Sequence, residues 1–127
     1  MTTIISRLKF RGWRVDINGW WMAGPDLMEL ERFFYRVRTG NIYHATVGQS
    51  LGDFDANGEE IYSGMEIEWW THGSRQRHRG TIILKSIACG AKVVVTESKH
   101  YRVGSHISWY SVNSTRQIVN EVSHEGN

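Results

Sequence analysis

The chain has 127 residues, which is enough for one domain with a hydrophobic core, and its 40% hydrophobic and 22% charged residues are typical of an ordered globular protein. Its single cysteine excludes an intramolecular disulfide and indicates the reducing cytosol. No apolar run is long enough to span a bilayer, and residues 1–7 lack the pattern of a signal peptide. The net charge is +2, but residues 53–68 hold six acids and no Lys or Arg, so the sequence predicts a dipolar surface.

The N-terminal part begins with a predicted β-hairpin. Residues 8–13 alternate between apolar and basic side chains, as in a strand with two different faces. Residues 16–19 read Asp-Ile-Asn-Gly, which favours a turn because Asn and Gly tolerate a positive φ, and Trp20 and Trp21 start the return strand. Gly24-Pro25 then ends this strand, and we expect Asp26 to cap the start of a helix.

Residues 27–47 fit two different structures. Four apolar residues recur at helical spacing: Leu27, Leu30, Phe34 and Val37. Gly40 suits the position just past the end of such a helix. Residues 33–37 are, however, aromatic and β-leaning, and the Thr-Gly-Asn at 39–41 can turn them into a strand at 42–47. We favour a short helical turn followed by a hairpin, with a helix as the alternative.

The second half is predicted to form short strands with glycine-marked turns between them. Asp55-Ala56-Asn57-Gly58 predicts a tight turn with Gly58 at a positive φ. Strands are expected at residues 65–70, 81–86, 92–97 and 106–112. Short strands of this kind with almost no proline are typical of a small barrel.

Two stretches of the chain resemble the YopX family of phage and prophage proteins. The first is Leu8-Lys9-Phe10-Arg11-Gly12-Trp13, with Trp20-Trp21 after the turn, which is similar to the family's opening Lys-Phe-Arg-x-Trp. The second and more distinctive stretch is residues 49–69, where an Asn-Gly turn leads to Glu-Ile-Tyr, a glycine and an apolar strand. Residues 118–125 are weakly similar to the end of the family's sequences. The family's usual Asp after Gly64 is Met65 in this chain.

The resemblance implies an SH3-like barrel in the second half and a phage or prophage origin, but it implies no single activity. Together with the patterns above it predicts a mainly β chain that forms one domain over residues 1–127. An N-terminal β-hairpin region is expected at residues 1–47 and an SH3-like barrel region at residues 48–127, with at most one short helix.

No group of residues has the pattern of a metal or catalytic site. Residues 53–58 match the first half of a calcium-binding EF-hand loop, but the twelfth position, which needs Glu, is Gly64, so a hairpin turn is the better interpretation. The six histidines lack metal-ligand spacing, and Cys89 ends an apolar segment and is interpreted as a small buried hydrophobe. No nucleophile elbow or nucleotide-binding glycine motif is present, so we expect no metal, no cofactor and no catalysis.

The strongest positive feature is the segment 69–80, in which two tryptophans end a strand and three arginines follow in a predicted exposed loop. Arginine binds phosphate through two parallel hydrogen bonds, and aromatic faces stack on bases or on guanidinium groups. The candidate binding residues here are Trp69, Trp70, His72, Arg75, Arg77, His78 and Arg79, and those in the hairpin are Trp21, Arg11 and Arg14. The alternative is a solvated loop with one tryptophan in the core, its neighbour at the surface, and both histidines exposed.

The sequence thus predicts a non-enzymatic accessory binding module in the cytoplasm of an infected bacterial host. Its partner is a host or phage protein, held by exposed aromatics such as Trp21 or Trp70, or a nucleic acid, held by the basic clusters. Alternatively, the chain sequesters a small nucleotide that signals defence, in an Arg- and Trp-lined pocket between protomers. A homo-oligomer without membrane contact is expected in each case.

Overall fold

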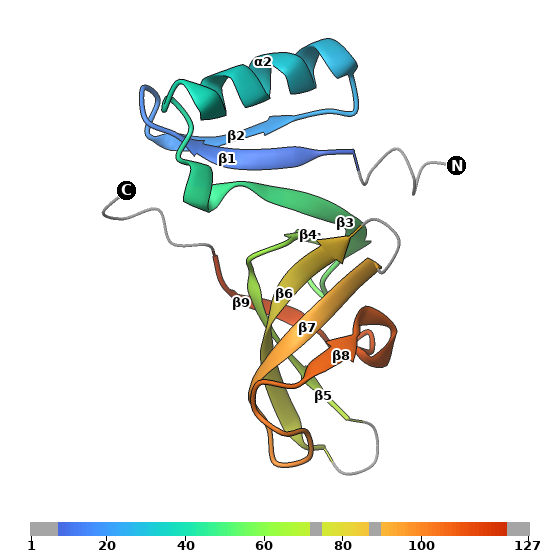
Figure 1. Ribbon diagram of the computed structural model, residues 1–127. Coiled ribbons are helices and arrows are strands. Elements are labelled where there is room, and N and C mark those ends of the chain that lie inside the picture. Colours follow the sequence, from blue (N-terminus) through green and yellow to red (C-terminus); the bar gives the residue numbers. More distant parts are fainter. Residues whose placement is uncertain (1–7, 72–74, 87–89, 122–127) are drawn as a thin grey trace.

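The computed structural model describes residues 8–71, 75–86 and 90–121 (Figure 1). It is mainly β, as predicted: within these residues the strands form two antiparallel sheets, and one α-helix covers the first sheet. In Figure 1 the helix and the hairpin β1–β2 form the upper part of the molecule, and the second sheet forms the lower part. None of the helices described is long and apolar enough to cross a membrane.

The first sheet has four strands in the order β2-β1-β3-β4. These are β1 (Phe10–Arg14), β2 (Gly19–Ala23), β3 (Gly48–Phe54) and β4 (Glu60–Tyr62). The predicted hairpin is confirmed, because β1 and β2 pair without a bulge from Phe10 opposite Ala23 to Arg14 opposite Gly19. Asn18 has a φ of 51° in the connecting turn, a conformation that Asn tolerates better than most residues.

Residues 27–38 form one helix, α2 (Leu27–Arg38), so the hairpin expected in this segment is wrong and the helical alternative is right. The Asp26 side chain caps the helix by accepting hydrogen bonds from the backbone N–H of Met28 at 2.8 Å and of Glu29 at 3.1 Å, which stabilises it by about 1 kcal/mol. Gly40 lies just past the helix with a φ of 84°. Tertiary burial on one face of the helix outweighs the β propensity of its aromatic residues.

Helix α2 packs on one face of the hairpin. Phe33 is fully buried there, which contributes about 2–3 kcal/mol, and its ring centroid lies 6.4 Å from that of Phe10. Gly12 permits this close packing, because a Cβ at its position would lie 2.4 Å from Cγ2 of Ile42 and 3.3 Å from Cζ of Phe33. Since side chains alternate along a strand, Arg11 lies on the opposite face of β1 from Gly12.

The second sheet has five strands in the order β8-β7-β6-β5-β9. These are β5 (Glu66–Trp70), β6 (Arg77–Ser86), β7 (Gly90–Glu97), β8 (His106–Ser108) and β9 (Gln117–Asn120). The sheet is strongly twisted but open, since β8 and β9 form its two edges and do not pair among the described residues (Figure 1). The strand expected at residues 106–112 is shorter than predicted, because a 3₁₀ helix (Trp109–Ser111) follows β8.

The main core lies against the inner face of this second sheet. Trp69, Ile67, Ile82 and Val93 are among its side chains and are 0–1% exposed. Strand β3 links the two parts, because it pairs with β1 and also contributes Leu51 to this core. The predicted turn at residues 55–58 is confirmed, with Gly58 at a φ of 83°. A second 3₁₀ helix (His44–Thr46) leads into β3.

Candidate functional site

The predicted site residues lie in two separate places. Arg11, Arg14 and Trp21 belong to the hairpin of the first sheet, whereas the residues at 69–79 belong to the second sheet. The prediction that three arginines share one exposed loop is wrong, because only Arg75 lies in a loop and strand β6 already begins at Arg77. The strand extends this far because β6 pairs with the whole of β5, up to Trp70 opposite Arg77. His72 and Cys89 lie outside the described residues.

The arginines of β6 are paired with carboxylates of neighbouring strands. Arg79 donates to Glu68 at 3.0 Å, and Arg77 donates to Glu68 at 3.5 Å and to Glu97. The hydrogen bond that Arg79 donates to Glu68 raises the pKa of Arg79 above its ordinary value. A phosphate would therefore have to displace carboxylates to reach these two arginines, which reduces what they offer to a nucleic acid.

His78 is fully buried rather than exposed in a loop, which corrects the prediction for this residue. Its Nδ1 lies 2.7 Å from Oγ of Ser98, and its Nε2 lies 2.9 Å from Oγ1 of Thr71. The Ser98 hydroxyl oxygen already accepts from the backbone N–H of His100 and Tyr101, so its hydrogen is donated to Nδ1, and Nε2 carries the ring proton. Burial, reinforced by the charge of His100, lowers the pKa of His78, so the ring is a neutral anchor that joins three segments.

The two neighbouring tryptophans of β5 have different environments. Trp69 is 1% exposed in the main core, with its ring centroid 5.4 Å from that of His78, while Trp70 on the other face of the strand is half-buried. The backbone of Trp70 is held by Thr115, whose Oγ1 accepts from its N–H at 2.9 Å. This pair therefore belongs mainly to the architecture of the sheet.

The cationic residues of the hairpin pack on aromatic rings inside the molecule. The Arg11 guanidinium lies 4.0 Å from the ring centroid of Trp20 and 4.8 Å from that of Tyr62, and it forms an ion pair with Glu121. Arg11 is only 8% exposed, so it joins β1 to β4 and to the residue after β9 rather than facing solvent.

The ring of Trp21 is in contact with two guanidinium groups and does not form an open binding face. Arg14 is 4.4 Å and Arg36 is 4.9 Å from its ring centroid. Arg14 also donates two hydrogen bonds of 2.7 Å to the Asp16 carboxylate, which hold the pKa of Asp16 well below its usual range. The predicted hairpin residues are therefore already engaged in contacts within the chain.

The outward face of α2 is the feature that the sequence reasoning missed. Leu27, Met28 and Tyr35 are 77%, 64% and 57% exposed, and they lie on the side of the helix opposite the buried Phe33. A groove of about 530 Å³ is lined by Met28, Glu31, Arg32, Phe34, Tyr35 and Arg38. A helical projection of residues 27–38 would show these apolar residues on the side away from Phe33. Such a projection can only be drawn once the segment is known to be a helix.

A second, basic cavity lies where β6 begins and β7 ends, and these strand ends are at the lower end of the second sheet in Figure 1. It measures about 560 Å³ and is lined by Arg75, Gln76, Arg77, Glu97, Ser98 and Lys99. Arg75 and Lys99 are exposed, and neither makes an ion pair with any described residue. This cavity contains two of the predicted arginines, Arg75 and Arg77.

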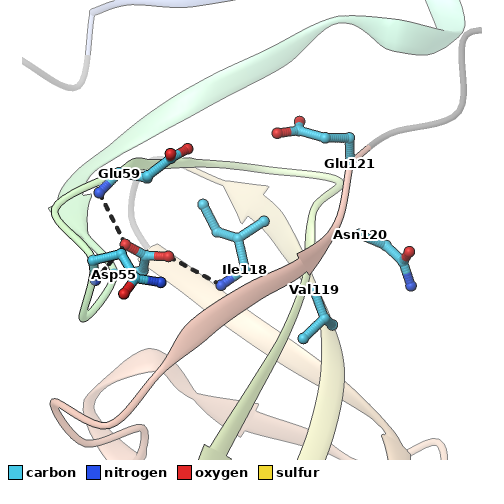
Figure 2. Close-up of a pocket in the computed structure, with 7 residues that line it drawn as sticks. Asp55, Glu59, Ile118, Val119, Asn120 and Glu121 are labelled. Atoms are coloured by element: carbon cyan, nitrogen blue, oxygen red, sulfur yellow. Dashed lines mark hydrogen bonds between the residues drawn. The ribbon is translucent and has the colours of Figure 1, made fainter.

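An acidic pocket of about 260 Å³ lies beside β9. Figure 2 shows the carboxylates of Glu59 and Glu121 entering it from opposite sides, with Ile118 between them. Asp55 is committed to the turn, because its carboxylate accepts from the backbone N–H groups of Asn57, Glu59 and Ile118 at 2.9, 2.9 and 3.2 Å. Glu121 is paired with Arg11, and no group of three metal-ligating side chains occurs among the described residues. The half EF-hand motif thus folds as a turn.

The chain matches no protein-family model and no curated protein. The geometry of the surfaces described above is therefore the basis for assigning a function, and the resemblance to the YopX family stays a prediction.

Proposed function

We propose that this chain is a non-enzymatic protein-binding module that docks a partner protein on the outward face of α2. The observation that carries the proposal is the groove on this helix, where Met28, Phe34 and Tyr35 combine apolar surface with the charged rims of Arg32 and Arg38. Aromatic residues, Met and Arg are the types that are enriched at the centres of protein interfaces.

Exposed apolar side chains are concentrated in the helix–hairpin part of the molecule, to which α2 belongs. Eleven large hydrophobic side chains are exposed among the described residues, and eight of them precede residue 36. Four of the eight belong to α2, namely Leu27, Met28, Phe34 and Tyr35, and the other four, Leu8, Val15, Ile17 and Met22, lie in or beside the hairpin. Single exposed apolar residues are ordinary, but a concentration of them on one part of a small protein is typical of an interaction surface.

A protein partner is favoured over a nucleic acid because of the ion pairs of β6. Arg77 and Arg79 each contact carboxylates within 4.0 Å, so the predicted three-arginine grip on phosphates loses two of its members. From the resemblance to the YopX family we extend the proposal to an accessory role during phage infection, with a host or phage protein as partner in the bacterial cytoplasm. Assembly into a homo-oligomer stays a prediction.

The test is capture of a partner from nuclease-treated lysate of infected bacteria, followed by affinity measurement with the purified partner. We expect Tyr35→Ala to weaken the affinity tenfold or more, which is the size of effect found at interface hot spots, and to leave the fold intact because Tyr35 is exposed. Tyr110→Ala is the matched control, since Tyr110 is 94% exposed on the other part of the molecule and should bind as the wild type does.

Two results would contradict the proposal. One is a partner that binds Tyr35→Ala and the wild type equally well. The other is capture that disappears when nucleic acid is digested, because the bridging molecule would then be DNA or RNA rather than a protein.

A further inference from the structure

We infer that the basic cavity lined by Arg75, Arg77 and Lys99 binds a phosphate group of an anionic ligand. Its lining residues are at the start of β6 and the end of β7, and these strand ends lie far from α2 in Figure 1, so this inference is independent of the proposed protein-binding surface. The cavity is built from two segments far apart in sequence, the first residue of β6 with the two residues before it and the last residue of β7 with the two residues after it.

The charges of the cavity leave it with a cationic excess. Three cations and one carboxylate line it, and the carboxylate of Glu97 is already paired with Arg77. Arg75 and Lys99 have no carboxylate partner among the described residues, unlike Arg79 a few residues away. Arg and Lys together fit phosphate, since a guanidinium presents two parallel N–H groups and an ammonium supplies a compact charge.

Hydrogen bonds fix the backbone on both sides of the cavity. On one side the backbone N–H of Arg75 donates to the Thr71 carbonyl at 3.1 Å, and that of Thr71 donates to the Gln76 carbonyl at 3.0 Å. On the other side the hydroxyl of Ser98 accepts from the backbone of His100 and Tyr101 at 3.0 and 2.9 Å.

The buried His78 joins the two sides, because its ring lies within hydrogen-bonding distance of both Thr71 and Ser98. The network thus places the start of the Arg75 side chain and that of Lys99 around one space before any ligand arrives. Preorganisation of this kind reduces the entropy lost on binding.

The size of the cavity matches a small phosphorylated molecule. Its volume of about 560 Å³ lies within the range of small-ligand sites. The shared chemistry is one or more phosphate groups that together carry two or more negative charges, and they belong to a free nucleotide or to successive phosphodiesters of a single-stranded nucleic acid.

The test is isothermal titration of the full chain at low salt with three probes: inorganic phosphate, adenosine triphosphate and a short oligothymidylate. We expect inorganic phosphate and the triphosphate to compete for one site. The double variant Arg75→Ala/Lys99→Ala should weaken binding by about tenfold or more for each removed cation. The matched control is Arg102→Ala, an exposed arginine of the same connection that does not line the cavity.

The probes separate the two sources. Binding of the triphosphate without the oligonucleotide indicates a nucleotide site, whereas oligonucleotide binding through the two unpaired cations, Arg75 and Lys99, should give a log–log salt slope of about −1.4. The inference is overturned if none of the three probes binds, or if the double variant binds as tightly as Arg102→Ala. Because Tyr35 lies on α2, loss of phosphate binding and loss of partner binding can be told apart with the same set of purified variants.

Discussion

The two parts of the molecule place their aromatic and charged side chains in opposite ways. The helix–hairpin layer exposes Tyr35 and Met28 to solvent and keeps the charged Arg11 inside, between aromatic rings. The second sheet buries Trp69 and covers its outer face with ion pairs such as Arg79 with Glu68. An outer face made of paired charges is well solvated, whereas an apolar helix face gains free energy when it is covered. The comparison supports the proposal that the first part carries a protein-binding surface.

The largest effect should come from an aromatic residue of the second sheet. Trp69→Ala removes a side chain that is 1% exposed and leaves a cavity, so we expect a loss of about 3–5 kcal/mol in the free energy of unfolding, measured by urea denaturation. Tyr35→Ala, at an exposed aromatic of the first part, should change that free energy by no more than about 0.5 kcal/mol. A large loss in Tyr35→Ala would show that α2 is covered within the chain and is not a free surface.

A smaller effect is expected at the junction of the two parts. Arg11→Met keeps a long side chain but removes the guanidinium from the rings of Trp20 and Tyr62 and from Glu121, so we expect a loss of about 2 kcal/mol. The control is Arg38→Met, because the Arg38 guanidinium lies 5.5 Å from the ring centroid of Tyr35 on the exposed face of α2, where about 1 kcal/mol or less is expected. Equal losses in the two variants would mean that Arg11 does not join the parts.

Much of the strand pattern was predictable from local sequence, because its signals are local. The turns at Asn18 and Gly58 need backbone conformations that few other residues adopt, and both were found at the expected places. The cap at Asp26 was likewise expected. Helix α2 was not favoured over the hairpin, because its formation depends on burial of Phe33 against Gly12 and Ile42, which are distant in sequence.

The site residues were harder to predict, because their roles depend on partners across the sheet. The run from Arg75 to Arg79 has the appearance of an exposed basic loop when it is considered alone. Pairing with β5 and β7 brings Glu68 and Glu97 to Arg77 and places His78 in the interior. The exposed face of α2 went unrecognised for the related reason that a helix has an outward face only once its inward face is known.

The smallest effect is expected from pH, and it sharpens the comparison by testing the buried polar anchor of the second sheet. His78 is neutral in the folded chain because burial, with a further contribution from His100, lowers its pKa, whereas in the unfolded chain it takes up a proton near the ordinary value of about 6.5. As the pH falls through that value, the unfolded state therefore binds more protons than the folded state. The free energy of unfolding is thus highest above this pH and decreases as the pH falls towards the lower pKa of His78 in the folded state. Urea denaturation at about pH 7.5 and about pH 5.5 should show this decrease in the wild type, and His78→Gln should show a smaller one because it cannot take up the proton. His106→Gln, at an exposed position on β8, is the control and should retain the pH dependence of the wild type. If His78→Gln loses stability with falling pH as steeply as His106→Gln does, then His78 is not the group whose protonation the fold resists.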